Sequence, residues 1–307
     1  MVKVSSVVLG VQTECKAHDL PAKCLREQGR PFSLVTGASQ GLGRALAEEC
    51  ARLGMNLILV ALPDTCLPKI SKEIACRYGV AVVYRETDLT APDSPKVIFR
   101  WIEDQKLRVH MLVNNAGIGC HGPFVDSRPE RNQAMINLNI TALVQLTHIF
   151  LPELKKHNRS YILNVASLAA FYAMPFKPVY APTKAFVLNF SLALRAELAE
   201  TAVKVSALCP GGIMTNEECR KLIAAQGFFG RISCHYPEEV ARYAIRQLFQ
   251  NRAIIVPGLV NKLARFLGGM TPLPLVQLFI RSRFDSANSG RAAAYGKSVP
   301  LLEINHE

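Results

Sequence analysis

Tyr180 and Lys184 are four residues apart in the segment YAPTK, and Ser167 precedes Tyr180 by thirteen residues. On a helix, residues i and i+4 share a face, so the phenol and the ammonium would lie together. A free tyrosine has a pKa of about 10, and a neighbouring cation lowers it by favouring the phenolate. This arrangement suits a proton donor and acceptor in catalysis. A half-buried helix without a catalytic role also produces the spacing, but Ser167 at the end of a predicted strand favours the catalytic interpretation.

A second candidate site is the glycine-rich segment TGASQGLGR at residues 36–44. It follows a short apolar run and precedes an amphipathic stretch, which is the order of a strand, a turn and a helix. Glycines let the backbone turn tightly and let a diphosphate approach the N–H groups and the positive dipole of a helix N-terminus. A strand–helix turn without a ligand also needs glycine, but the position after the first strand predicts a phosphate-binding loop.

The elements that position these residues alternate along the chain from residue 32 onward. Short runs rich in Val, Ile and Leu predict strands at residues 32–36, 56–61, 80–86, 110–114, 160–166, 204–209 and 253–257. The stretches between them predict helices at residues 42–53, 64–78, 94–106, 129–157, 179–202 and 237–250. The runs are mostly apolar without alternation, which is typical of strands buried on both faces. The pattern predicts an α/β fold, a Rossmann-type doubly wound sheet of seven mainly parallel strands flanked by helices.

The spacing G-x-x-x-G-x-G of the glycine loop resembles that of the short-chain dehydrogenase/reductase family. Further segments resemble motifs of that family in the same order: TDLT around Asp88, NNAG at residues 114–117 and PGGIMT at residues 210–215. The family's catalytic tetrad is matched by Asn139, Ser167, Tyr180 and Lys184. The resemblance covers residues 32–258 and implies hydride transfer between a nicotinamide dinucleotide and a carbonyl or an alcohol.

The resemblance also implies a role for each residue. Tyr180 would be the acid/base, Lys184 would bind the nicotinamide ribose and tune Tyr180, and Ser167 would hydrogen-bond the substrate oxygen. Asn139 would hold a water in the proton relay, with Asn137 as the rival candidate, and Asp88 would contact the adenine. The cofactor-binding residues implied in this way are Thr36, Gly37, Ser39, Gln40, Gly41, Leu42, Gly43, Arg44, Asp88, Leu89, Asn115, Ala116, Gly117, Tyr180, Lys184, Pro210, Gly211, Ile213 and Thr215.

The end of the second predicted strand bears on the choice of dinucleotide. A carboxylate there would bond the ribose 2′-hydroxyl and select NAD, but the strand ends Val60-Ala61-Leu62-Pro63. Asp64 comes slightly too late and is expected to cap the next helix. The basic residues that family members use for NADP, at Leu62 or Gln40, are missing here, and Arg44 is the remaining candidate for a 2′-phosphate. NADP is therefore expected, and NAD stays an alternative.

The predicted activity is NAD(P)-dependent reduction of a carbonyl to an alcohol, or the reverse, with Tyr180 as proton donor or acceptor. The substrate walls are expected at residues 169–179 and in the region after Thr215, through residues 227–230. The first segment is made apolar by Phe171, Tyr172, Met174 and Phe176. Apolar walls suit a lipophilic ketone of acyl, steroid-like or aromatic type, as in lipid metabolism. Alternatively, these side chains pack on a helical lid or a partner subunit.

Pro182 departs from the small residues that the family usually has at this position of the Tyr–Lys motif. Proline is tolerated in the first turn of a helix, so activity is expected to survive if the helix begins near Tyr180. The departure nevertheless leaves a second candidate function, a catalytically idle dinucleotide-binding sensor or scaffold.

Composition excludes several classes of protein. The 307 residues are 50% hydrophobic and 20% charged, which excludes a disordered, collagen-like or coiled-coil chain. The net charge of +12 is expected to reflect a generally basic surface or an anionic ligand; no basic-aromatic module predicts nucleic-acid binding. None of the nine cysteines forms a C-x-x-C pair and the seven histidines are scattered, so no metal site is predicted.

The surplus length lies at the two ends of the chain. The expected division is an N-terminal arm at 1–30, a catalytic domain at 31–258 and a C-terminal extension at 259–307, whose tail from 286 is expected to be loose. The uncharged stretch 266–280 is shorter than the roughly 20 residues that span a bilayer, and prolines and glycines interrupt it. It is expected to contact a membrane surface through 259–283, to cover the substrate cleft or to join a subunit interface. A cytoplasmic homo-oligomer, a dimer or tetramer, is expected, with membrane association as an option.

Overall fold

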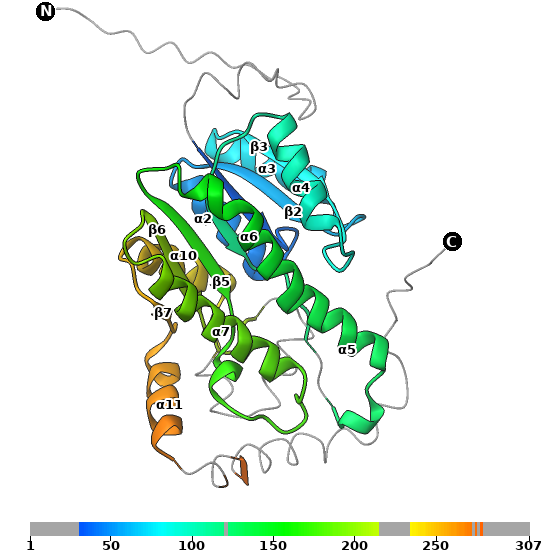
Figure 1. Ribbon diagram of the computed structural model, residues 1–307, viewed down its shortest axis with the longest axis vertical. Coiled ribbons are helices and arrows are strands. Elements are labelled where there is room, and N and C mark those ends of the chain that lie inside the picture. The colour runs from blue at the N-terminus through cyan, green and yellow to red at the C-terminus, as the bar shows by residue number, and fades with distance from the viewer. Residues whose placement is uncertain (1–30, 120–121, 215–233, 272–273, 275–276, 279–307) are drawn as a thin grey trace, which may run out of the picture.

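The computed structural model describes residues 31–119, 122–214 and 234–271, together with residues 274, 277 and 278. Seven parallel strands form one sheet in the order β3-β2-β1-β4-β5-β6-β7 (Figure 1). The strands are β1 (Phe32–Thr36), β2 (Asn56–Ala61), β3 (Val82–Glu86), β4 (Val109–Asn114), β5 (Ser160–Val165), β6 (Val203–Leu208) and β7 (Ile254–Ile255). The chain winds outward in both directions from β1 and β4, so the predicted doubly wound Rossmann-type sheet is confirmed.

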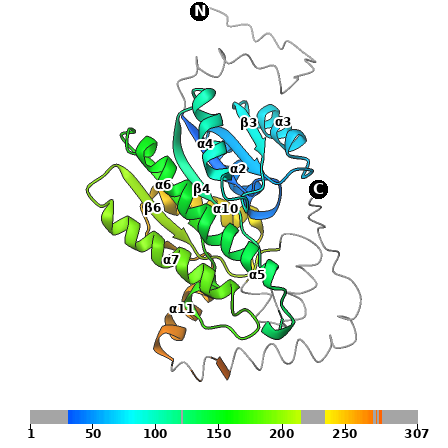
Figure 2. The same cartoon turned by 45° about the vertical axis from the view of Figure 1, so that its right-hand side comes forward.

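Helices cover both faces of this sheet. The described helices are α2 (Gly41–Arg52), α3 (Leu67–Tyr78), α4 (Ser94–Asp104), η1 (Phe124–Asp126), α5 (Pro129–Ile136), η2 (Asn137–Ala142), α6 (Leu143–Leu154), η3 (Leu168–Phe171), α7 (Tyr180–Glu197), α10 (Pro237–Phe249) and α11 (Leu259–Met270). One apolar cluster joins α2, α3 and α10 to the sheet, and a second joins α4, α6 and α7 to it. Figure 2 shows α6 and α7 side by side on the second face.

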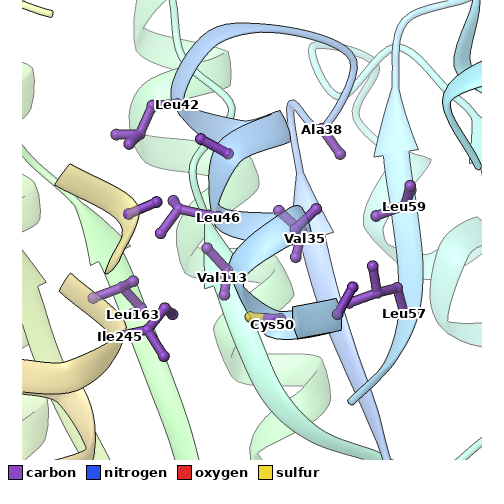
Figure 3. Packing of buried hydrophobic residues seen from close by; sticks show 14 of the residues in the cluster. Val35, Ala38, Leu42, Leu46, Cys50, Leu57, Leu59, Val113, Leu163 and Ile245 are labelled. Atoms are coloured by element: carbon purple, nitrogen blue, oxygen red, sulfur yellow. The ribbon is translucent and has the colours of Figure 1, made fainter. Parts of the chain in front are cut away.

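The strands are apolar throughout because each face of the sheet buries every second side chain. On β1, Val35 packs toward α2 and Leu34 packs into the cluster on the opposite face. Figure 3 shows Val35 with Leu46 of α2 and with Leu57 and Leu59 of β2. This two-sided burial explains why hydrophobic alternation is missing from the sequence and fixes where each strand ends.

Two predictions about element boundaries need correction. The helix predicted from residue 64 begins at Leu67, and its N-cap position is Cys66, with no side-chain capping hydrogen bond. Asp64 and Cys66 both have positive φ angles, 60° and 56°, so the chain makes a tight turn before α3 and Asp64 does not cap it. The last strand is also shorter than predicted, with two residues in place of five.

The elements α5, η2 and α6 form one continuous rod (Figure 1). Within the described part of the chain it is the one helix long and apolar enough to cross a membrane, with 26 residues and an 18-residue stretch whose mean hydropathy is 1.4. Only the length and the composition of the rod support a membrane span. In the structure, its side chains Met135, Leu146 and Phe150 are buried inside the protein. We therefore interpret it as a core helix, which delivers Asn139 to the carboxyl ends of the strands.

Candidate active site

The glycine loop at the carboxyl end of β1 is held by the start of the NNAG segment. The Thr36 hydroxyl accepts hydrogen bonds from the backbone N–H groups of Asn115 (3.0 Å) and Ala116 (3.1 Å). The Asn115 side chain donates to the Thr36 carbonyl at 2.9 Å and to the Gly37 carbonyl at 3.3 Å. Gly37 has a φ of +66°, and a Cβ at Gly43 would overlap the Gly37 carbonyl oxygen. The loop is therefore tight enough to exclude side chains at these two glycines.

The loop presents the N-terminus of α2 to a ligand. The helix begins at Gly41, and its N-cap residue Gln40 makes no side-chain capping hydrogen bond. The first N–H groups of a helix have no intrahelical partner and attract anions together with the helix dipole. A cavity of about 200 Å³ adjoins this end, lined by Gly41, Arg44, Ala45, Glu48, Met214, Tyr236, Pro237 and Glu238. This geometry suits a diphosphate.

The remaining residues expected to bind the dinucleotide lie along the same edge of the sheet. Asp88 follows β3 and its Oδ1 accepts from the Thr90 N–H at 2.8 Å, while Leu89 is buried. The Pro210 carbonyl accepts from the Leu168 N–H at 2.8 Å, and residues 212–214 pair with His235. The glycine loop, Asp88, residues 115–117 and residues 210–213 thus follow the carboxyl ends of four strands, β1, β3, β4 and β6. Thr215 and residues 227–230 lie outside the described residues.

Ser167, Tyr180 and Lys184 converge at the carboxyl end of β5. Helix α7 begins at Tyr180, so Pro182 lies in its first turn, where proline is tolerated. Ser167 is hydrogen-bonded to the Tyr180 phenol. The Lys184 Nζ lies 6.0 Å from the centroid of the Tyr180 ring and donates to the Val165 carbonyl at 2.9 Å. The three side chains form one polar group at this end of β5.

Burial controls the proton affinities in this group. It raises the pKa of Tyr180, and the hydrogen bond from Ser167 offsets only part of that rise. It also lowers the pKa of Lys184 from 10.5 to about 8. The sequence argument expected Lys184 to bring the pKa of Tyr180 down, whereas desolvation of the phenolate dominates in this structure and raises it. Burial thus favours the neutral phenol of Tyr180.

Asn139 lies in the π-helical turn η2, in the middle of the rod, which passes beside this group. Its Nδ2 donates to the Ile118 carbonyl and to the Thr183 hydroxyl, each at 3.0 Å, and its Oδ1 accepts from the Ile118 N–H at 3.0 Å. The rival Asn137 is half-buried, and its Oδ1 accepts a hydrogen bond from Gln133. Of the two asparagines, the structure brings Asn139 to the site, and π-helical turns often occur at functional sites.

Gly117 separates Asn139 from Lys184. A Cβ at Gly117 would lie 3.0 Å from the Asn139 Oδ1 and 3.2 Å from the Lys184 Nζ. Both polar atoms therefore approach the Gly117 backbone closely, and a side chain at this position would prevent that approach.

Arg44 is engaged by carboxylates. Its Nε contacts Glu48 at 2.9 Å and its Nη2 contacts Glu73 at 3.1 Å, and these contacts raise its pKa. At the end of β2, Leu62 is 45% exposed and no acidic side chain occupies the tip. Arg44 is therefore already paired with two carboxylates before any phosphate binds. The sequence did not reveal this pairing, because Glu73 is on another helix.

The four apolar side chains expected to line the substrate cleft divide into two groups. The Arg265 guanidinium of α11 lies 4.9 Å from the Phe171 ring centroid, and the Tyr172 hydroxyl donates to the Ala264 carbonyl at 2.6 Å. Phe171 and Tyr172 thus pack against α11, which lies beyond the end of α7 in Figure 1. Phe176 instead lines a recess together with Tyr180. Met174, which lies between Tyr172 and Phe176 in the chain, is half-buried.

A buried polar network behind the site was missed by the sequence analysis. The Asn114 Nδ2 donates to the Thr147 hydroxyl at 3.0 Å and to the Asn164 Oδ1 at 2.9 Å, and the Asn164 Nδ2 donates to the Ser191 hydroxyl at 2.9 Å. It connects α6, β4, β5 and α7. The signal was an asparagine inside the otherwise apolar run SYILNVA. Among the described residues, no group of three or more His, Cys, Asp or Glu side chains is placed to hold a metal ion.

Comparison with known proteins identifies the family. The family model for short chain dehydrogenases matches residues 32–222, which is more than half of the chain. The chain belongs to the short-chain dehydrogenase family. The family expected from the motifs is thereby confirmed, and the glycine loop and the Ser167–Tyr180–Lys184 group all lie within the matched residues.

Two curated relatives and one solved structure illustrate the similarity. The rat (Rattus norvegicus) 17-beta-hydroxysteroid dehydrogenase type 3 is 34% identical over 206 residues, 66% of this chain and 65% of that protein. The very-long-chain 3-oxoacyl-CoA reductase-B of Danio rerio is 34% identical over 190 residues, 60% of each chain. The chain therefore spans less than two thirds of the length of these relatives. A solved 7beta-hydroxysteroid dehydrogenase has a TM-score of 0.74 and 25% identity, and covers 85% of this chain and 99% of its own.

Similar solved structures contain nicotinamide dinucleotides of both types. A short-chain dehydrogenase from Sphingobium yanoikuyae, 26% identical, with a TM-score of 0.64 and covering 88% of this chain and 97% of its own, holds NADPH. One from Burkholderia phymatum, which shows the fold alone at 23% identity, with a TM-score of 0.68 and covering 78% of this chain and 92% of its own, holds NAD. The Sphingobium yanoikuyae structure supports a nicotinamide dinucleotide as the cofactor, without deciding between NADP and NAD.

Proposed function

We propose that the protein reduces a lipophilic ketone to an alcohol, with the Tyr180 hydroxyl as the proton donor. The observation that carries this proposal is the convergence of Ser167, Tyr180 and Lys184 at the end of β5, on the same edge of the sheet as the glycine loop. The dinucleotide supplies the hydride when bound. Ser167 and Tyr180 hydrogen-bond the substrate oxygen, where negative charge develops in the transition state.

The raised pKa of Tyr180 favours reduction over oxidation at neutral pH. A phenol that keeps its proton can deliver it to a developing alkoxide, whereas oxidation needs the phenolate as a base. Burial, which raises that pKa, thus suits the reductive direction. For reprotonation of Tyr180 we propose a relay through Lys184 and a water near Gly117, within reach of the Asn139 Oδ1.

The proposed substrate is apolar next to its carbonyl. Phe176 lines the recess beside Tyr180, and Phe171 and Tyr172 form the adjoining wall under α11. The relatives whose names include hydroxysteroid dehydrogenase and very-long-chain 3-oxoacyl-CoA reductase add support for a steroid-like or acyl carbonyl. The contact between α11 and the segment after Ser167 supports a part for the start of the C-terminal extension in substrate specificity.

For the cofactor we propose NADP over NAD. The tip of β2 carries Leu62 in place of a carboxylate, so the charge that would repel a 2′-phosphate is missing there. Arg44 would have to exchange Glu73 for the phosphate. Glu73→Gln is expected to ease that exchange and to raise the NADPH:NADH ratio of kcat/KM several-fold, whereas Arg44→Ala lowers it. If neither variant changes the NADPH:NADH ratio of kcat/KM, the 2′-phosphate of the dinucleotide does not bind at Arg44.

The experiment that tests the proposed activity follows NADPH oxidation with a panel of steroid-like, acyl and aromatic ketones. Tyr180→Phe is expected to lower kcat at least 100-fold because it removes the proton donor. Tyr84→Phe, on β3, is the matched control that removes a phenol from another part of the protein. Turnover retained by Tyr180→Phe would overturn the assignment of the donor.

The alternative function is a catalytically idle dinucleotide sensor. It is favoured by the two ion pairs of Arg44 with Glu48 and Glu73, because these pairs make Arg44 less available for a 2′-phosphate. Tight dinucleotide binding by calorimetry without turnover across the panel would support it.

For location and assembly we propose a cytoplasmic homo-oligomer, a dimer or tetramer, with peripheral membrane contact through residues 259–283. On α11, Leu259, Leu263 and Phe266 are spaced along one face and are 82%, 56% and 65% exposed. Such a face suits a lipid surface or a second subunit. Leu263→Glu with Phe266→Glu in the full chain is expected to abolish sedimentation with anionic liposomes. If it changes only the oligomeric mass, the face is a subunit interface.

A further inference from the structure

Thr183 lies between Tyr180 and Lys184 in the chain, and the proposed reaction gives it no part. It is in the first turn of α7 and is only 2% exposed. A buried hydroxyl is stable only with hydrogen-bond partners, and Thr183 has two. Its hydroxyl accepts from the Asn139 Nδ2 at 3.0 Å and donates to the Tyr180 carbonyl at 2.8 Å. One side chain therefore joins the rod to the helix that carries the proton donor.

The direction of these hydrogen bonds sets the orientation of the Asn139 amide. A hydroxyl has one hydrogen, and that of Thr183 goes to the Tyr180 carbonyl, so Thr183 can only accept from Asn139. The Nδ2 of Asn139 therefore faces Thr183 and gives its other hydrogen to the Ile118 carbonyl at 3.0 Å. The Oδ1 accepts from the Ile118 N–H and is turned toward Gly117, where the relay water is proposed.

Pro182 makes this turn of α7 more dependent on the Thr183 side chain. Proline has no N–H to donate to the preceding turn. Its two neighbours do donate: the Ala181 N–H to the Lys177 carbonyl and the Thr183 N–H to the Val179 carbonyl, each at 3.1 Å. The Thr183 hydroxyl gives the turn a further hydrogen bond beside the one that Pro182 cannot make.

The relay depends on side chains from separate elements that must stay in register. A group that passes a proton must lie within about 2.6–3.2 Å of its partner. The Lys184 Nζ is fixed against β5 by its hydrogen bond to the Val165 carbonyl at 2.9 Å. The Thr183 hydroxyl fixes Asn139 of the rod relative to Tyr180 at the start of α7. Loss of this hydroxyl would therefore disturb the distances over which the proton moves.

We propose that Thr183 is a positioning residue for the proton relay of Tyr180. Its single hydroxyl sets the orientation of the Asn139 amide and ties the first turn of α7 to the rod. This inference rests on the proposed carbonyl reduction and names a residue that holds its site in order. Thr183 acts through Asn139 and Tyr180, so its loss is expected to change kcat and to leave binding nearly unchanged.

Steady-state NADPH oxidation with the best ketone of the panel measures kcat and KM of the variants. Thr183→Val replaces the hydroxyl with a methyl group of similar size and leaves a buried N–H of Asn139 without its acceptor. It is expected to lower kcat about 10-fold or more, with KM and the Kd for NADPH changed less than about threefold. Thr183→Ser keeps the hydroxyl and is expected to hold kcat within about threefold of wild type.

Thr147→Val is the matched control, because it makes the same change at another buried threonine. The Thr147 hydroxyl accepts from the Asn114 Nδ2 at 3.0 Å in the network behind the site. It is expected to keep the wild-type kcat below its melting transition. If Thr183→Val keeps the wild-type kcat, or if Thr147→Val lowers kcat equally, the proposal is overturned. If Thr183→Val does not fold, Thr183→Cys replaces it, since a thiol is a weak acceptor; a kcat equal to that of Thr183→Ser would then overturn the proposal.

A measurement without turnover separates this inference from the proposed reaction. In protein with ¹⁵N-labelled asparagine, the side-chain amide signal of Asn139 is identified by its loss in Asn139→Asp. Its hydrogens are expected to exchange with solvent about 10-fold faster or more in Thr183→Val than in the wild type, and unchanged in Thr147→Val. Equal exchange in Thr183→Val and wild type refutes the positioning role even in an active enzyme. If the wild type reduces no ketone, carbonyl reduction is refuted for this panel, and the exchange rates still decide whether Thr183 holds Asn139.

Discussion

Gly117→Ala places one methyl group between the two polar atoms proposed to share a relay water. The new Cβ would lie 3.0 Å from the Asn139 Oδ1 and 3.2 Å from the Lys184 Nζ, both shorter than ordinary van der Waals contacts. Neither neighbour can move freely, because Asn139 is tied to Ile118 and Thr183, and the Lys184 Nζ is bonded to the Val165 carbonyl.

The size of the effect follows from these constraints. Overpacking of a tight site by one methyl group costs about 1–3 kcal/mol. If the methyl group displaces Asn139 and Lys184, this cost is added to the activation free energy of the reaction. An increase of about 1.4 kcal/mol in that free energy lowers the rate tenfold. We therefore expect kcat to fall about 10- to 100-fold, with dinucleotide affinity changed less than kcat.

The assay is steady-state NADPH oxidation with the best ketone of the panel, with circular dichroism and thermal melting to establish folding. Gly119→Ala is the matched control, since a Cβ there would meet the Tyr180 ring carbons at 3.5 Å, an ordinary contact. It is expected to keep kcat within threefold of wild type. If Gly117→Ala is folded and as active as Gly119→Ala, the space between Asn139 and Lys184 has no role in proton transfer.

Three further outcomes are expected. Reduction should be constant at neutral pH and decline as pH rises through about 8, because the lowered pKa of Lys184 means that its protonated form is present below that pH and lost above it; a profile flat to pH 10 would contradict this. Gly43→Ala should weaken dinucleotide binding more than 10-fold in a fluorescence titration, because its Cβ would overlap the Gly37 carbonyl oxygen and open the loop; unchanged affinity would show that the loop tolerates expansion. Asn164→Ala should lower the melting temperature by several degrees, since it leaves the buried Asn114 amide short of a partner at a cost of about 1–3 kcal/mol; a melting temperature equal to wild type would show that the network is not stabilising.

The fold could be predicted because its signals are local. Apolar runs of five to seven residues marked β1, β2, β4 and β5 within a residue or two. Element boundaries were wrong where the chain makes a tight turn, as before helix α3, or where strand pairing lasts two residues, as in β7. The positive φ angles of Asp64 and Cys66 depend on packing of the turn, which composition does not encode strongly.

The sequence by itself determined the family, the sheet, the glycine loop between β1 and α2 and the residue types of the Ser–Tyr–Lys group, because these depend on short motifs and their spacing. Only the tertiary structure decided which asparagine reaches the site, that Glu73 engages Arg44, that Phe171 lies under α11 and that Thr183 bonds Asn139. Each of these contacts joins a side chain to the environment that the folded chain creates around it. Burial, which raises the pKa of Tyr180 and lowers that of Lys184, is likewise a property of the packed molecule and not of the motif.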